Sequence, residues 1–218
     1  MILSGWRSKQ LLLLTFFFSL LSATESQALH RKGQLGFTAS ILSGFPSGNF
    51  SKLTNTGLGV GVELEYYLSQ SFALGFLFNY LPFQGPDIVD SITLSEEWTI
   101  TSYGFLGKYQ FSPEKEVVPY LKVGGLVSFY EVNITRQVSP PIDTSFSEQA
   151  KLTAMGGVGM RWDIENWVGV SGELLFTKIF EVVHDLTSYP GGNRVEVDAQ
   201  FVSFNLNATI FLGGSKEK

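Results

Sequence analysis

Cysteine is absent from this chain of 218 residues, which excludes a disulfide framework, a thiolate nucleophile and a cysteine metal site. Histidine is nearly absent as well, with only His30 and His184. Charged residues make up 16% of the chain and the formal net charge is −5, so the sequence lacks the basic surface that nucleic-acid binding needs. We therefore expect no nucleic-acid partner, no metal and no cofactor.

Long apolar runs are also missing, apart from one near the start. Residues 11–21 (LLLLTFFFSLL) follow Arg7 and Lys9, and this run is shorter than the roughly 20 residues of a transmembrane helix. A positive start, a short apolar core and then small residues are typical of a secretory signal peptide. We predict that residues 1–28 are removed by cleavage after Ala28, with Ala23 as the alternative, and that residues 29–218 form one domain.

Glycine and phenylalanine are abundant, with 23 and 19 residues, and the mature chain alternates apolar and polar positions. In TGLGVGVELEYYL, residues 56–68, the leucines, valines and Tyr66 fall on one face of a strand, and the glycines with Glu63 and Glu65 fall on the other. The same period-2 pattern predicts eight strands, at about 34–43, 56–68, 71–82, 97–111, 118–132, 151–163, 167–180 and 197–212.

The predicted connections are alternately short and long. The long ones are residues 44–55, 83–96, 133–150 and 181–196. This arrangement predicts an all-β, eight-stranded antiparallel up-and-down transmembrane β-barrel, with short periplasmic turns and four long extracellular loops.

A secreted soluble barrel of the lipocalin type would show the same alternation with its apolar face inward. Three features favour the membrane. The polar face is mostly Gly, Ser, Thr and Asn; most strands reach the nine to eleven residues that a tilted membrane strand needs; and aromatic residues mark the strand ends of the apolar face, as in outer-membrane girdles. We therefore predict the bacterial outer membrane as the location, with its lipid and lipopolysaccharide as partners.

The signal peptide, the eight strands and the glycine-rich stretches GLGVGVELEYYL, LKVGGLVSFY and AMGGVGMRWDI resemble the small outer-membrane barrels of the OmpA, OmpX and opacity-protein type. The resemblance covers residues 29 to 213. It implies the fold and the compartment, and it carries little information on activity because it rests on patterns rather than on invariant residues.

Six charged residues occupy inward positions in the periplasmic half of the predicted barrel. Because an eight-stranded barrel is just wide enough for its own side chains, charges there must pair. We predict a structural ion-pair network that closes the lumen, made of Glu63, Glu65, Lys108, Lys122, Arg161 and Glu173.

A catalytic site is not indicated. His184 is next to Asp185 and near Ser188, but adjacent residues do not easily form the relay of a catalytic triad, which is defined by geometry. The sequence therefore favours a non-enzymatic surface barrel, structural or adhesive, whose loops bind a host or environmental protein. A lipid A-modifying enzyme of the deacylase or palmitoyltransferase type, and a small-solute channel, are the alternatives.

Overall fold

The protein folds as one closed sheet in the computed structural model, which describes residues 32–85, 88–90, 92–136, 142–147, 150–185 and 194–213. Among these residues no helix is long and apolar enough to cross a membrane. The predicted signal peptide, residues 1–28, and His30 lie outside the described residues, so signal cleavage stays a prediction.

Ten strands and one short helix make up the described residues. They are β1 (Leu35–Ser47), η1 (Phe50–Lys52), β2 (Gly57–Tyr67), β3 (Phe72–Gln84), β4 (Ile88–Asp90), β5 (Ile92–Gln110), β6 (Val117–Arg136), β7 (Ile142–Ser147), β8 (Lys151–Glu165), β9 (Val168–Asp185) and β10 (Arg194–Leu212).

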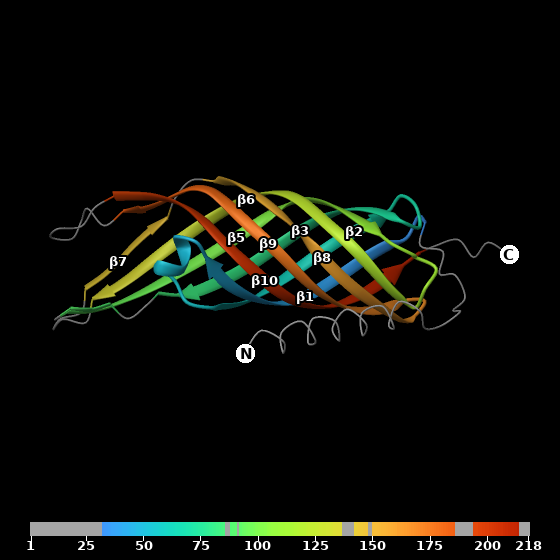
Figure 1. Cartoon of the computed structure of the whole chain (residues 1–218), viewed down its shortest axis with the longest axis horizontal. Coiled ribbons are helices and arrows are strands. Elements are labelled where there is room, and N and C mark those ends of the chain that lie inside the picture. The colour runs from blue at the N-terminus through green and yellow to red at the C-terminus, as the bar shows by residue number, and fades with distance from the viewer. Residues whose placement is uncertain are drawn as a thin grey trace, which may run out of the picture.

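Eight of the strands close into a barrel of antiparallel neighbours, in the order β1, β2, β3, β5, β6, β8, β9, β10 and back to β1. The closing seam pairs Leu35 with Leu212 at one end and Ser47 with Gln200 at the other. The short turns gather at one end of the barrel, on the right in Figure 1, and the long connections gather at the other. The predicted fold class is confirmed.

The pleat places the apolar face outside. In β2 buried and exposed residues alternate without a break, and Leu58 is 67% exposed while Glu65 is 1% exposed. The same holds around the barrel, where exposed aromatic and aliphatic side chains cover the wall and the buried charged side chains all lie in the lumen. A continuous apolar exterior, with the charged residues enclosed, is the arrangement of a membrane barrel and excludes the soluble lipocalin alternative.

Several strands run further than the alternation predicted. β5 begins at Ile92 rather than 97, β6 ends at Arg136 rather than 132, β9 ends at Asp185 rather than 180, and β10 begins at Arg194 rather than 197. β4 and β7, both within predicted loops, pair with the outer ends of β5 and β6. Outside the membrane these extended hairpins pair their backbone groups by continuing the sheet.

Candidate functional site

The six charged residues of the predicted network lie on five different strands and point into the lumen. Their positions follow from the pleat, since each lies at an inward register position of its strand. All are at most 4% exposed, so water screens these charges little. They are Glu63 and Glu65 on β2, Lys108 on β5, Lys122 on β6, Arg161 on β8 and Glu173 on β9.

Lys122 joins two carboxylates that come from different strands. Its Nζ lies 2.7 Å from Glu63 Oε2 and 2.5 Å from Glu173 Oε1. Glu173 also accepts hydrogen bonds from Tyr120 Oη at 2.8 Å and from Asn205 Nδ2 at 3.3 Å. Strands β2, β6 and β9 are therefore tied together across the lumen by one ammonium group.

Lys108 holds the two glutamates of β2 from the other side. Its Nζ pairs with Glu65 Oε1 and lies 3.6 Å from Glu63 Oε1, and it lies 4.7 Å from the centre of the Tyr120 ring. Glu63 thus has a lysine near each of its oxygens. The two lysines and three glutamates form one connected group of buried charges.

Arg161 belongs to the same layer, but it reaches the glutamates only through Tyr67. Its Nη1 donates to Tyr67 Oη at 2.8 Å, and that hydroxyl donates to Glu65 Oε2 at 2.8 Å. The direct carboxylate partner of Arg161 is Asp163, at 2.7 Å from Nε and 3.2 Å from Nη2. Its guanidinium carbon also lies 5.1 Å from the ring centre of Phe211.

Asp163 and the two tyrosines are the members that the sequence reasoning missed. The signal was present, because Asp163 has the same strand parity as Arg161, and Tyr67 has the same parity as Glu65. With Asp163 included, four carboxyl groups meet three cations, so the layer carries a formal charge of −1 rather than zero.

Glycines make room for these large polar side chains. A Cβ at Gly159 would overlap the ring of Tyr120, and a Cβ at Gly169 would lie 2.8 Å from Asp163 Oδ1. Neither position tolerates a side chain unless the network shifts. The glycine-rich inner face is therefore a requirement of packing bulky charged and aromatic groups into a narrow barrel.

Above the charged layer the lumen is filled by apolar and hydroxyl side chains. The first level is a cluster of buried apolar residues: Leu77, Leu106, Leu126, Met155 and Leu175. Above it Ser102, Ser128 and Thr153 are linked by hydrogen bonds of 2.6 and 2.7 Å. A cavity of about 10 Å³ beside Asn79 and Ser203 has room for roughly one water molecule.

The extracellular end is closed by an apolar cluster that we call the aromatic plug. Phe50 of η1 is fully buried in it, at 5.4 Å from Phe83 and 5.6 Å from Trp98 between ring centres. The predicted loop 44–55 therefore folds into the mouth of the barrel. The plug comprises Leu42, Phe50, Leu81, Phe83, Trp98, Ile100, Tyr130, Val132, Ile179, Val182, Ala199 and Phe201.

The rim beyond the plug is held by polar contacts. Tyr130 Oη donates to the carbonyl of Val183 at 3.0 Å and accepts from its N–H at 2.7 Å, which fixes β9 over the mouth. Lys178 and Asp198 form a partly exposed ion pair at 2.7 Å. The hydrogen bond from Lys178 lowers the pKa of Asp198 below its ordinary value.

His184 lies within β9, where its backbone pairs with Val195, and not in a loop as expected. Within the described ranges there is no group of three or more His, Cys, Asp or Glu residues arranged to hold a metal ion. The buried acids instead have lysine, arginine and tyrosine partners, as a structural network requires.

These features define a membrane barrel of eight strands whose lumen is filled by its own side chains. A family model described as "Outer membrane protein beta-barrel domain" matches residues 11–209, and the chain belongs to this family. It is therefore a protein of the bacterial outer membrane. No curated protein sequence matches the chain significantly.

Solved structures of small outer-membrane barrels share the fold. OprG from Pseudomonas aeruginosa matches with a TM-score of 0.58 and 12% identity, over 85% of this chain and 98% of that one. A major outer membrane protein from Thermus thermophilus matches at 0.52 and 14%, over 82% and 99%. Ail from Yersinia pestis, in complex with the heparin analogue sucrose octasulfate, matches at 0.51 and 11%, over 83% and 99%. At these identities the likeness concerns the fold alone.

Proposed function

We propose that this protein is a non-enzymatic surface barrel, structural and adhesive, whose extracellular hairpins bind a host or environmental protein while its lumen stays closed. The observation that carries the proposal is the filled lumen. A charged layer, an apolar layer and the aromatic plug follow one another from the periplasmic end to the extracellular end. A barrel filled at three levels offers neither a path for solutes nor a cleft for a substrate.

The extracellular hairpins supply the surface for a partner. β5 and β6 have 19 and 20 residues, whereas crossing the membrane takes about 9–11. Their outer ends, flanked by β4 and β7, form a four-stranded extension of the sheet outside the membrane (Figure 1). A sheet fixed to a rigid barrel presents a preformed surface, which lowers the entropic cost of binding.

A protein partner is favoured over a sulfated polysaccharide, although Ail was solved with a heparin analogue. In residues 83–96, 133–150 and 181–196 of this chain, acidic residues outnumber basic ones. Such a balance repels a polyanion unless a cation bridges the two.

The enzyme alternative is weakened by the arrangement of the buried acids. Glu63, Glu65 and Glu173 each contact a lysine inside the filled lumen, and catalysis would require one of them to face a substrate. The channel alternative needs a continuous aqueous path, and the side chains at three levels obstruct one.

The proposal is tested with the refolded protein in lipid bilayers. We expect no steady single-channel conductance, and we expect binding to at least one member of a panel of host matrix proteins. Variants that lack residues 88–94 or 137–147 should keep the heat-modified gel mobility of a folded barrel and lose that binding. Steady conductance of the wild type, or full binding by both deletion variants, would contradict the proposal.

Orientation is tested on intact cells. An epitope inserted between β6 and β7, at residues 137–141, should be labelled from outside, because the end of β6 at Arg136 and the start of β7 at Ile142 lie at the extracellular end. The same epitope inserted at residues 112–116, in the turn between β5 and β6, should be labelled only after the outer membrane is permeabilised. The opposite labelling would reverse the orientation.

A further inference from the structure

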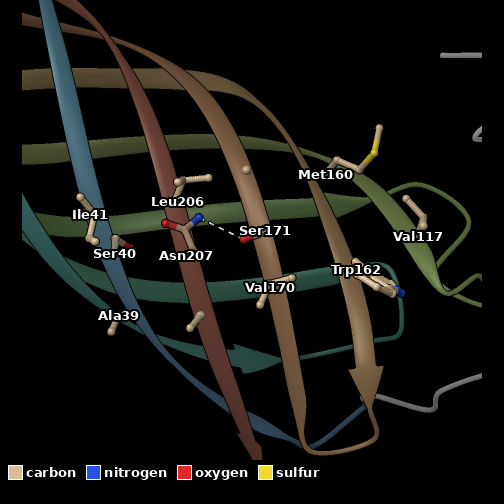
Figure 2. Close-up of a pocket in the computed structure, with 12 residues that line it drawn as sticks. Ala39, Ser40, Ile41, Val117, Met160, Trp162, Val170, Ser171, Leu206 and Asn207 are labelled. Atoms are coloured by element: carbon tan, nitrogen blue, oxygen red, sulfur yellow. Dashed lines mark hydrogen bonds between the residues drawn. The ribbon is translucent and has the colours of Figure 1, made fainter. Parts of the chain in front are cut away.

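The outer, lipid-facing wall of the barrel carries an apolar groove of about 980 Å³, which plays no part in filling the lumen. It crosses β1, β10, β9 and β8 and reaches the first residue of β6 (Figure 2). The side chains that border it are mainly Ile41, Val117, Met160, Trp162, Val170 and Leu206. It is separate from the extracellular hairpins, so it concerns a different interaction from the proposed adhesion.

The groove exists because three small residues occupy outward positions among these larger ones. Ala39 and Ala208 face each other across the β1–β10 seam, and Gly172 pairs with Leu206 on one side and Met160 on the other. The barrel does not need a glycine there, because a Cβ at Gly172 would meet its nearest neighbour, the Phe204 ring, only at 3.9 Å. The inner face is different, since a Cβ at Gly157 would overlap the carbonyl oxygen of Leu174.

The groove lies in the periplasmic half of the wall and opens at its edge. Val117 begins β6 and pairs with Trp162, which lies three positions before the end of β8. The wall here borders hydrocarbon, because the lipid-facing side chains continue on both sides of the groove. An occupant must therefore be an apolar chain of the periplasmic leaflet.

The residues at the periplasmic edge of the groove indicate which lipid headgroup would fit there. Trp162 is fixed there, since its Nε1 donates to Glu116 Oε1 at 2.7 Å. Tryptophan at this depth marks the boundary between hydrocarbon and headgroups. The two turns nearest to Trp162 carry Glu114, Glu116 and Glu165 against one cation, Lys115, so the rim beside Trp162 is acidic. Such a rim attracts a cationic amine and repels an anionic headgroup. A primary ammonium group, unlike a quaternary one, can also donate hydrogen bonds to the carboxylates.

We propose that this groove binds one phospholipid with a primary-amine headgroup, a phosphatidylethanolamine. One acyl chain lies along Ala39, Ala208 and Gly172, and the ammonium group faces the glutamates beside Trp162. The lipid is retained at this site for longer than the surrounding lipid, because it is held at both its chain and its headgroup.

Native mass spectrometry of the refolded protein, released from detergent with defined lipids, tests this. The probes are dioleoyl phosphatidylethanolamine, dioleoyl phosphatidylcholine and dioleoyl phosphatidylglycerol, which share their chains. The wild type should retain one phosphatidylethanolamine in preference to the other two. Gly172→Leu combined with Ala208→Leu fills the groove and should weaken retention by about tenfold, because several methylene contacts are lost.

Gly156→Leu is the matched control, since Gly156 is another outward glycine whose added Cβ makes only ordinary contacts, at 3.7 Å or more. This variant should retain the lipid as the wild type does. Glu116→Gln with Glu165→Gln should abolish the preference over phosphatidylcholine, while the new amide oxygen at position 116 can still accept the indole N–H. Equal retention of all three lipids by the wild type, or unchanged retention in the filled groove, would overturn the proposal.

Discussion

The two halves of the lumen are filled by opposite kinds of side chain. In the periplasmic half, Lys122 bridges Glu63 and Glu173 within a layer of buried charges. In the extracellular half, Phe50 packs edge to face on Phe83 and Trp98. Both halves fill the same narrow barrel, and strands β5, β6 and β9 contribute side chains to each of them.

The difference lies in how each half depends on its members. A buried ion pair compensates a large desolvation cost only when every partner is present, so removing one group leaves another charge unpaired. An aromatic cluster is stabilised by buried apolar area and close packing. Removing one ring therefore loses the stabilisation from that ring's buried area and leaves a cavity, while the other rings keep theirs. Loss of any one member of the charged half should therefore destabilise the remaining charges as well. Loss of one member of the aromatic half should remove only the stabilisation that this member contributed.

The largest expected effect is that of Lys122→Ala. This change leaves Glu63 and Glu173 without their shared partner, and we expect a loss of roughly 3–5 kcal/mol in the free energy of unfolding. Urea unfolding in lipid vesicles, followed by gel mobility, measures it. The control is Lys178→Ala at the partly exposed rim pair, for which we expect about 0–1 kcal/mol. Equal losses in the two variants would show that the lumen charges are not coupled.

Phe50→Ala tests the other half. The loss of a fully buried ring from the aromatic plug should lower the free energy of unfolding by about 3 kcal/mol, measured by urea unfolding in lipid vesicles. The barrel should nevertheless remain closed to ions in planar bilayers, because the charged layer is untouched. Steady conductance of Phe50→Ala would mean that the plug alone closes the lumen. The double variant with Lys122→Ala should be the first to conduct.

Gly157→Ala tests the packing of the apolar layer that separates the two halves of the lumen. The new Cβ would overlap the Leu174 carbonyl and press on Leu175 of the apolar layer, so we expect about 1–3 kcal/mol of destabilisation. Gly125→Ala is the matched control, because an added Cβ there has no neighbour within 4 Å. Similar unfolding curves for the two variants would contradict the close packing described for the inner face.

The smallest expected effect concerns the rim pair of Lys178 and Asp198. Because the pKa of Asp198 is lowered, its contribution to stability is present at neutral pH and is lost as the pH falls through that lowered pKa. The stability difference between the wild type and Asp198→Asn should therefore be under about 1 kcal/mol at neutral pH and should vanish in acid. High salt should reduce it as well. If the stability difference between the wild type and Asp198→Asn persisted in acid, it would have to come from packing and not from the ion pair.

The alternation of apolar and polar residues along the chain was sufficient to predict the barrel strands, their inward faces and the charged residues at inward positions. It did not predict β4, β7 or the outer ends of β5 and β6, because polar segments such as IDTSFS read as loops until their hairpin partners are known. Asp163 was missed because an acid close to a turn resembles a solvated one. The burial of Phe50 depends on the shape of the barrel mouth, which local sequence does not encode.

The seam between β1 and β10 has a consequence for how the protein assembles. It joins the first and last strands of the barrel, so closure must wait until nearly the whole chain is available, and such long-range contacts form slowly. Lys122 is 59 residues from Glu63 and 51 from Glu173, and the three meet only when the sheet has rolled up. Before that moment these three charges are hydrated separately. The Lys122 bridge therefore stabilises the completed barrel and not an open sheet, which makes insertion cooperative.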